Sequence, residues 1–483
     1  MFLKFKLNKA SSQVDMLNGP LTVKMLKYAM TIAVSGALQQ LFNSADVAVV
    51  GQFAGSNALA AVGTNGSLIN LMINLFVGLS IGTNVVVATL TGEGNREGIR
   101  KAVHTSIALA FISGIFLAVM GWALARPILG RLSTPPEILD DAVLYLQIYF
   151  LGMPFVMLFN FAAAILRSQG DTRRPLIALL VSGVINVILN LVFVAGMGMT
   201  VDGVAIATVI SSAVSSLMLL SFLKHEIGPL RLDFRRLCID PQMMERIGQI
   251  GIPAGLQGCL FSLSNVMIQD SINALGAATI AACTAALNFE YYTYFVANSF
   301  SQTATTFIGQ NYGAGNFGRC RSIARRCVWL GVLCTGLLSA VFCLFAHPLV
   351  GIFTSSAIVA GLAVVRMYII TSTEFLNAVV EAMTGILRGF GYSLVPTMVS
   401  ILGICGLRLF WLYAVYPNWN TFPSLMSVYP ISWIVTSIVM GLAYLEVLRT
   451  LKRKRGYSVT SRREMLKRVA GAMHLHRIHI HRI

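Results

Sequence analysis

Charged residues are scarce in this sequence. They make up 11% of the 483 residues, whereas 56% are hydrophobic, and the mean hydropathy is +0.73. About 25% of the residues of an average soluble domain are charged. Because the shortage extends over the whole length, it argues against a soluble globular protein and predicts a polytopic membrane protein.

Cysteine pairs and catalytic motifs are also absent from the sequence. The eight cysteines include no CxxC pair. Most of them lie in apolar segments, so we interpret them as small hydrophobic residues and not as a disulfide framework or a metal site. No HExxH motif or P-loop is present. Residues 78–82 fit GxSxG, but they lie inside an apolar run instead of at a strand–turn–helix. We therefore expect neither an enzyme nor a cofactor.

Long apolar runs recur along the chain and predict twelve membrane-spanning helices, because about 20 apolar residues cross a bilayer as a helix. A helix satisfies its backbone hydrogen bonds within its own segment, which favours helices over strands in lipid. The predicted spans lie near residues 25–50, 57–85, 102–125, 141–165, 175–197, 203–223, 248–274, 278–306, 327–346, 364–387, 394–416 and 428–448.

An internal repeat divides the chain into two similar halves. An offset of 221 residues carries the stretch 165–175 onto 386–396, and it also carries Gly94 onto Gly315. One register held over so much of the chain indicates duplication, because chance matches would drift. The predicted fold is an all-α polytopic membrane protein with two six-helix lobes in the same orientation, and a centrally bound ligand should lie between them. The expected domains are an N-lobe at 1–223, a linker at 224–247, a C-lobe at 248–449 and a basic tail at 450–483.

Lysine and arginine gather in alternate loops, and this asymmetry sets the orientation of a membrane protein. The basic loops contain Lys24 and Lys27; Arg96, Arg100 and Lys101; Arg173 and Arg174; Lys224, Arg231, Arg235, Arg236 and Arg246; and Arg319, Arg321, Arg325 and Arg326. The loops between them carry almost no basic residues. We therefore expect a multi-pass protein of the inner cell membrane with both termini in the cytoplasm.

The C-terminal tail carries much of the net charge of +17, since residues 452–483 hold ten lysine or arginine residues against one glutamate. Such a run directly after a spanning helix suits anionic lipid headgroups on the cytoplasmic side, and topogenic charge alone is the alternative. Because no aromatic platform accompanies the charge, nucleic-acid binding is not expected. We interpret the four histidines of the tail as part of a disordered end and not as a metal site.

Polar side chains inside the predicted spans of the first half indicate a cation or proton pocket. Asp46 is the clearest case, since a charge at membrane depth is costly and usually functional. Asn186 and Asn190 are four residues apart and share one helix face. Tyr145 and Thr208 lie at a similar depth in two other spans. Hydrogen bonding between helices is the alternative role for the uncharged members of this set.

The second half offers candidate residues for a substrate cavity. They are Glu290, Tyr291, Tyr294, Glu374, Glu381 and Arg408. Aromatic faces beside carboxylates suit flat or cationic compounds. Packing is the alternative for the aromatic residues, and an ion pair between Arg408 and one of the acids is the alternative for the charged ones. Arg167 and Arg388 fall at the ends of predicted helices, where we expect them to serve structure or orientation.

Together these residues resemble the multidrug and toxic compound extrusion (MATE) family, and most of all its bacterial DinF-like branch. The matching stretches are 46–51, 58–63, 167–175, 203–208, 309–315 and 387–396, followed by Arg408. The resemblance implies two six-helix lobes around a V-shaped cavity. It also implies export of organic cations and other toxic compounds in exchange for sodium ions or protons.

The same resemblance implies a coupling site in the N-lobe. That site would fall on Asp46, Tyr145, Asn186, Asn190 and Thr208, with a sodium ion at Asp46 as the one possible metal. Many members of the branch have Asp where this chain has Asn190, which puts a proton site with two carboxylates in doubt.

The predicted function is a cation-coupled multidrug efflux antiporter that works by alternating access, as a monomer, on drug-like and mainly cationic small molecules. A flippase for lipid-linked glycans is the alternative, because related flippases share the two-lobed architecture. A cavity for a polyprenyl pyrophosphate should present several cationic residues. The sequence offers only Arg408 and Arg366 for that purpose.

Overall fold

The computed structural model describes residues 13–131 and 136–480. The part of the chain that it describes is helical, and its only β-type pairing is an isolated bridge between Gln13 and Asp171. The prediction of an all-α protein is confirmed.

The helices follow one another along the chain with short connections. The first half contains α2 (Leu21–Val49), α3 (Gly55–Gly92), α4 (Arg96–Arg131), α5 (Pro136–Leu151), α6 (Met153–Ser168), α7 (Arg173–Asn190) and α8 (Val201–Lys224). The second half contains α9 (Pro241–Ala274), α10 (Ala277–Gly313), α11 (Phe317–Leu344), α12 (Ala346–Gly351), α13 (Ala357–Ile369), α14 (Glu374–Gly389), α15 (Leu394–Ser400), α16 (Leu407–Phe410) and α17 (Phe422–Ile480). Short π-helical and 3-10 segments extend or join several of these helices at η1 (Val50–Ala54), η2 (Leu191–Gly196), η3 (Phe234–Arg236), η4 (Thr371–Thr373), η5 (Ile401–Gly406), η6 (Trp411–Val415) and η7 (Tyr416–Asn418).

Each of the twelve predicted spans corresponds to helix in the structure. Ten helical segments of the described chain are long and apolar enough to cross a membrane, and α5 and α6, which meet at a 46° bend, together form an eleventh. Gly152 and Pro154 stand at this bend, where the sequence predicted one straight span. The remaining predicted span, at 278–306, is α10, which is 37 residues long but rich in threonine, serine and amide side chains.

The linker between the halves is shorter than predicted, because α9 begins at Pro241 and not near 248. Asp240 caps this helix by accepting hydrogen bonds from the backbone amides of Gln242 and Met243, both at 3.1 Å. The hydrogen bond from Met243, together with the nearby Lys101, holds the pKa of the Asp240 carboxyl below its usual range. Proline at the first helical position completes this start signal.

The repeat is visible in the helix boundaries. The 221-residue offset carries the start of α7 at Arg173 onto that of α15 at Leu394, and the start of α8 at Val201 onto that of α17 at Phe422. Glycines with positive φ precede helices at three positions of each half, at 55, 94 and 170 and again at 276, 315 and 391. Because glycine adopts positive φ without steric cost, the duplication extends to the turns as well as the helices.

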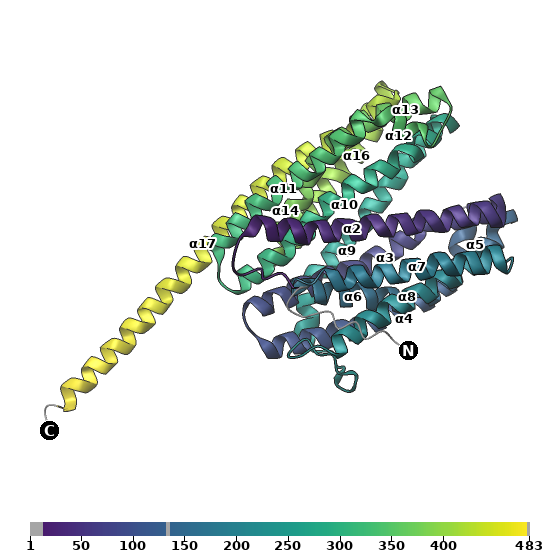
Figure 1. Cartoon of the computed structure of the whole chain (residues 1–483). Helices are drawn as coiled ribbons and strands as arrows, with labels where there is room; N and C mark the ends of the chain where they lie inside the picture. Colours follow the sequence, from purple (N-terminus) through teal and green to yellow (C-terminus); the bar gives the residue numbers. More distant parts are fainter. Residues whose placement is uncertain (1–12, 132–135, 481–483) are drawn as a thin grey trace.

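The helices form two arms that diverge from a common end (Figure 1). Helices α3–α8 belong to one arm and α10–α17 to the other, while α2 runs lengthwise between the arms. Helix α2 packs against both α7 and α10, and α3 packs against both α9 and α10. Helix α17 leaves the common end without a break, so the predicted basic tail continues the last span.

Glycines let α3 and α9 pack at backbone distance across the two halves. A Cβ atom on Gly78 would lie 2.2 Å from the amide nitrogen of Gly255, and one on Gly255 would lie 2.3 Å from the carbonyl oxygen of Leu75. No side chain can occupy that space, so small residues at this crossing permit the close approach.

Residues 13–20 form a strap that contacts both halves at the common end. The amide of Val14 donates to the carbonyl oxygen of Gly170 in the first half, at 3.1 Å. Asn311 of α10, in the second half, donates through its Nδ2 to the carbonyl oxygen of Met16, also at 3.1 Å. The strap therefore joins the two halves by hydrogen bonds.

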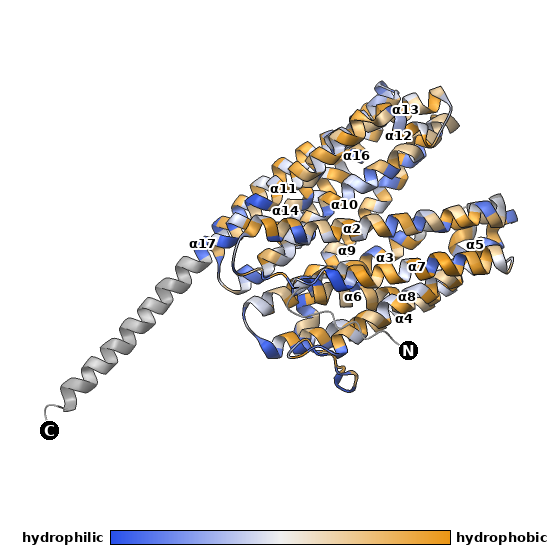
Figure 2. Cartoon of the chain, in the orientation of Figure 1, coloured by the Kyte–Doolittle hydropathy of each residue, from blue (hydrophilic) through white to orange (hydrophobic). Residues whose placement is uncertain are grey.

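The outer faces of the helices are apolar along much of their length (Figure 2). On α11, Trp329, Leu333 and Leu337 are 70%, 54% and 60% exposed at a spacing of one helical turn. A long exposed apolar stripe of this kind marks a surface that another apolar phase covers. Together with the span lengths, it is typical of a protein embedded in lipid.

Candidate functional site: a polar cavity between the halves

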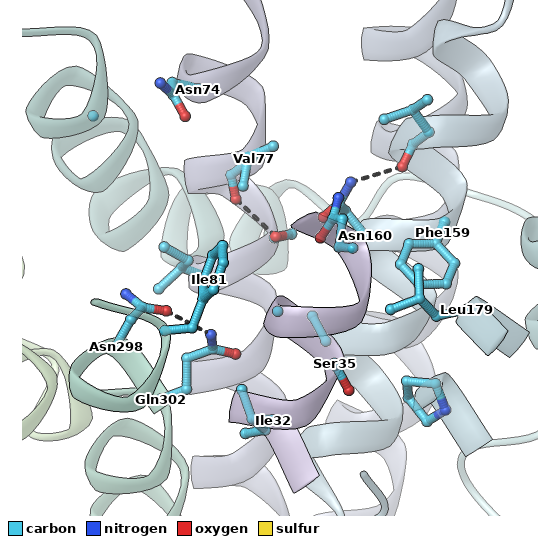
Figure 3. A pocket seen from close by; sticks show the side chains of 18 of the residues that line it. Ile32, Ser35, Asn74, Val77, Ile81, Phe159, Asn160, Leu179, Asn298 and Gln302 are labelled. Atoms are coloured by element: carbon cyan, nitrogen blue, oxygen red, sulfur yellow. Dashed lines mark hydrogen bonds between the residues drawn. The ribbon is translucent and has the colours of Figure 1, made fainter. Parts of the chain in front are cut away.

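A cavity of about 520 Å³ lies between the two halves, and residues of α2, α3 and α5–α10 together with α14 line it. Figure 3 shows part of its wall, with Asn74, Asn160 and Gln302 among the labelled side chains. The polar lining includes nine serine or threonine residues and nine amides, and the amides are Gln39, Asn43, Asn74, Asn84, Asn160, Asn186, Gln257, Asn298 and Gln302. Four ionisable side chains of opposite sign join them: Asp46, Arg167, Glu381 and Arg388.

The predicted residues of the first half form a hydrogen-bonded chain around Asp46. Asn190 donates through Nδ2 to Asp46 Oδ1 at 2.5 Å and to Asn186 Oδ1 at 3.3 Å. Asn186 in turn donates to Thr208 Oγ1 at 3.5 Å. Asp46, Asn186 and Thr208 line the cavity, whereas Asn190 is fully buried, and its Oδ1 has no donor among the described residues. Polar side chains of α7 and α8 therefore join Asp46 of α2 in one hydrogen-bonded chain.

Tyr145 is buried, and its neighbour Tyr149 lines the cavity instead. The two rings stack with centroids 6.0 Å apart and planes 21° from parallel. Tyr149 was not among the predicted site residues, although its position four residues after Tyr145 puts both rings on one face of α5.

A polar stripe on α2 was also missed. Ser35, Gln39, Asn43 and Asp46 all line the cavity and are spaced three or four residues apart. This spacing puts them on one face of the helix, and it is readable in the sequence once Asp46 is taken as the reference.

Of the six candidates in the second half, the cavity wall includes Tyr294 and Glu381. The other four lie elsewhere among the described residues: Glu290, Tyr291, Glu374 and Arg408. Tyr291 is 43% exposed and stacks on Phe295 with ring centroids 6.4 Å apart. Glu374 is buried and accepts a hydrogen bond from Asn377 at 2.7 Å.

The partner of Glu290 is Arg366. An ion pair between Arg408 and one of the acids was the alternative, but no carboxylate oxygen of the described residues lies within 4.0 Å of Arg408. The two oxygens of Glu290 accept from Nε and Nη2 of Arg366 at 2.7 and 2.9 Å. Arg408 instead donates to Asn265 at 3.0 Å, and its guanidinium lies 4.3 Å from the ring centroid of Tyr429. The pairing depends on which helices face each other, and residue spacing along the chain does not report that.

Arg167 and Arg388 line the cavity. The expected role in structure or orientation therefore does not account for their whole environment. Arg167 donates to Gln302 Oε1 at 3.2 Å, and Arg388 donates to Gln257 Oε1 at 2.8 Å. The Nε atom of each arginine is buried and has no acceptor among the described residues. Their equivalence under the 221-residue repeat was a signal that both face the space between the halves.

An amide chain crosses the wall from the first half to the second. Arg167 bonds to Gln302, whose Nε2 donates to Asn298 Oδ1 at 2.9 Å, as Figure 3 shows. Asn298 then donates to Glu381 Oε2 at 3.3 Å. A cationic and an anionic side chain thus stand at opposite ends of two amides, and each is hydrogen-bonded to a neutral neighbour.

The comparisons with known proteins fit this geometry. A model of the MatE family matches residues 31–192 and 253–413, one stretch in each half. The chain therefore belongs to the MatE family, which confirms the resemblance. It is an integral multi-pass membrane protein, and as a member of a family of transporters it is not an enzyme.

Individual relatives cover most of the chain. It is 28% identical over 395 residues to the probable multidrug resistance protein YoeA of Bacillus subtilis, which covers 80% of this chain and 85% of that protein. It is 26% identical to the probable multidrug resistance protein NorM of Thermotoga maritima, covering 80% of this chain and 84% of that one. These bacterial relatives support the bacterial branch of the family, and neither name favours a flippase.

The fold also matches solved structures. An outward-facing multidrug resistance MATE transporter superposes with a TM-score of 0.84 at 21% identity, covering 91% of this chain and 99% of that one. At this identity the match shows the shared fold, and with it the predicted two-lobed architecture.

Proposed function

We propose that this protein is a cation-coupled efflux antiporter that exports drug-like small molecules by alternating access. The observation that carries the proposal is the cavity between the halves, whose wall places Asp46 beside Asn186 and Thr208. Its volume of about 520 Å³ lies in the range of sites for drug-sized ligands. The names of the relatives support drug-like substrates.

Asp46 carries the coupling cation in this proposal, as a sodium ion or a proton. It is the only acidic side chain that the described first half contributes to the cavity wall. The free Oδ1 of Asn190 adds an oxygen ligand next to it. Hard cations prefer carboxylate and neutral oxygen ligands. One charge moved through 100 mV supplies about 2.3 kcal/mol, which is enough for roughly fifty-fold accumulation.

The proposed orientation, with both termini in the cytoplasm, is supported by the distribution of basic residues among the loops. The strap and α17 lie at the end where the arms meet, and α5 and α13 lie where the arms diverge (Figure 1). In this orientation the structure is the outward-facing state of the exporter. A rocking motion of the halves would then open the cytoplasmic side.

Two proposals concern the surroundings of the chain. One chain supplies the whole described cavity wall, so the protein is proposed to act as a monomer. The lysine- and arginine-rich continuation of α17 is proposed to lie at anionic lipid headgroups of the cytoplasmic leaflet, where each basic residue contributes about 1 kcal/mol.

Expression in a bacterial host that lacks its own efflux pumps tests the proposed function. The wild-type protein should raise tolerance to ethidium, and Asp46→Asn should abolish the gain at an equal amount of protein in the membrane. Unchanged tolerance in cells with confirmed membrane expression would contradict the proposal.

A further inference from the structure

We propose that Arg167 and Arg388 bind a carboxylate of the exported molecule, so that the preferred substrates are amphoteric compounds with one carboxylate and one amine. The inference rests on the proposed export of small molecules. It departs from the expectation of mainly cationic substrates, since Glu290 and Glu374 do not line the cavity.

The first observation is that both guanidinium groups reach the cavity without an acidic partner. Among the described residues, neither arginine has a carboxylate oxygen within the 4.0 Å of an ion pair, and the acceptors they do have are the neutral side chains of Gln302 and Gln257. Arg388 is only 8% exposed. Glu381 is near enough to act on Arg388 electrostatically but lies beyond ion-pair distance. A buried charge without a directly bonded opposite charge is costly, so a site for an anion explains this arrangement.

Other buried arginines of the same chain have partners that compensate their charge. Arg366 forms a two-point ion pair with Glu290 at 2.7 and 2.9 Å. Arg174 bonds to Glu226 at 2.5 Å and also to Asp171. Arg408 lacks a carboxylate but lies over the ring of Tyr429, and it does not line the cavity.

The second observation is the position of the two arginines in the repeat. Arg167 is near the end of α6 and Arg388 near the end of α14, at equivalent points of the two halves. The Nε atom of each arginine is buried in the wall, so a ligand would meet the terminal nitrogens. A guanidinium presents its donors in a planar fork that matches a carboxylate. A carboxylate held here would therefore contact residues of both halves.

The third observation is the charge balance of the cavity wall. Asp46 and Glu381 match the two arginines in number, so the wall is neutral when all four are ionised. Glu381 lies two helical turns before Arg388 on the same helix and is hydrogen-bonded by Asn298. A compound with an amine and a carboxylate can place the amine toward Glu381 and the carboxylate toward Arg388.

Rhodamine 110 and its methyl ester, rhodamine 123, form a matched pair of fluorescent probes. The two dyes differ by one esterified carboxylate, and each can be titrated onto the purified full chain by fluorescence anisotropy. We expect the wild type to bind rhodamine 110 about tenfold more tightly, since a hydrogen bond to a charged group contributes enough for that ratio. Arg388→Gln and Arg167→Gln should each remove this preference and leave rhodamine 123 binding within about twofold.

Arg408→Gln is the matched control, because it removes a buried arginine that lies outside the cavity; it should keep the preference. Equal binding of the two dyes by the wild type would overturn the carboxylate site. So would an equal loss of both dyes in Arg388→Gln protein that remains monodisperse.

Export of both dyes from proteoliposomes separates this inference from the proposed function. Arginine-dependent binding of rhodamine 110 without export of either dye would contradict the efflux function and leave the carboxylate site standing. Export of both dyes at the same rate, by the wild type and by both arginine variants, would support efflux and contradict the site.

Discussion

Gly92 and Gly313 hold α3 and α10 in backbone contact at equivalent points of the two halves. A Cβ atom on Gly92 would lie 1.9 Å from the carbonyl oxygen of Gln310, and one on Gly313 would lie 2.1 Å from that of Thr89. Thr89 and Gln310 are themselves separated by the 221-residue offset, so the crossing is symmetric. It joins the halves near the common end, which is the closed side in the proposed outward-facing state.

Alanine at Gly92 should therefore weaken closure of the common end. The added methyl group cannot fit unless α3 and α10 separate, and overpacking of this kind costs about 1–3 kcal/mol. We expect spin labels on the cytoplasmic ends of α3 and α10 to show a longer distance in Gly92→Ala than in the wild type. Gly441→Ala in α17 is the control, because a Cβ there meets no atom within 4 Å. An unchanged distance in Gly92→Ala would contradict the role of this crossing.

The strap at residues 13–20 should depend on Arg319. Its Nη2 donates to the carbonyl oxygens of Asn18 and Gly19 at 3.0 and 3.1 Å, and its Nε donates to that of Met16 at 3.3 Å. Since each hydrogen bond contributes about 1 kcal/mol, Arg319→Ala should speed amide hydrogen exchange in the strap roughly tenfold or more. Arg325→Ala, at an exposed position of the same helix, should leave exchange unchanged. Equal exchange rates in the two variants would show that the strap is held by other contacts.

Cys238 provides a native probe of the orientation. It is the one exposed cysteine among the eight and lies between α8 and α9, in the linker that we propose to be cytoplasmic. In intact cells an impermeant maleimide should leave it unlabelled, and permeabilised cells should show labelling that Cys238→Ser removes. Labelling from outside would reverse the orientation, and with it the direction of transport.

The polar cluster around Asp46, which we propose as the coupling site, could be predicted from the sequence because its members follow helical spacing. Asn186 and Asn190 are four residues apart, so they share one face of any helix that contains them. Asp46 could be identified because a charged side chain in lipid is costly. The repeat similarly predicted two halves around a central site. The sequence also predicted α10 as a span, although the polar residues of this helix weaken the hydropathy signal.

Which residues of the second half line the cavity could not be predicted in the same way. Whether Glu290 meets Arg366 or Arg408 depends on how three helices face one another, and the sequence reports only the face of each helix. The same limit hid the cavity positions of Arg167 and Arg388, since a helix end can point to lipid headgroups or to an interior. Packing between the halves decides these cases.

Asn190→Asp tests how the coupling site selects its cation. The substitution puts a second carboxylate within hydrogen-bonding reach of Asp46, because the present Nδ2–Oδ1 distance is 2.5 Å. Two carboxylates that share a site do not both ionise readily, so one of them holds a proton more tightly. We expect export by this variant to respond more to a pH gradient and less to a sodium gradient than the wild type does. Identical responses of the two proteins would contradict a part for Asn190 in cation selection.

Export from proteoliposomes by Asp46→Asn tests the coupling mechanism most directly. The purified variant and the wild type are each given a sodium gradient or a pH gradient at zero membrane voltage, and efflux of a fluorescent substrate is followed over time. The nearly isosteric amide should preserve folding and substrate binding, while gradient-driven export falls to the level of protein-free liposomes. Full activity of Asp46→Asn under either gradient would remove this residue from the coupling mechanism.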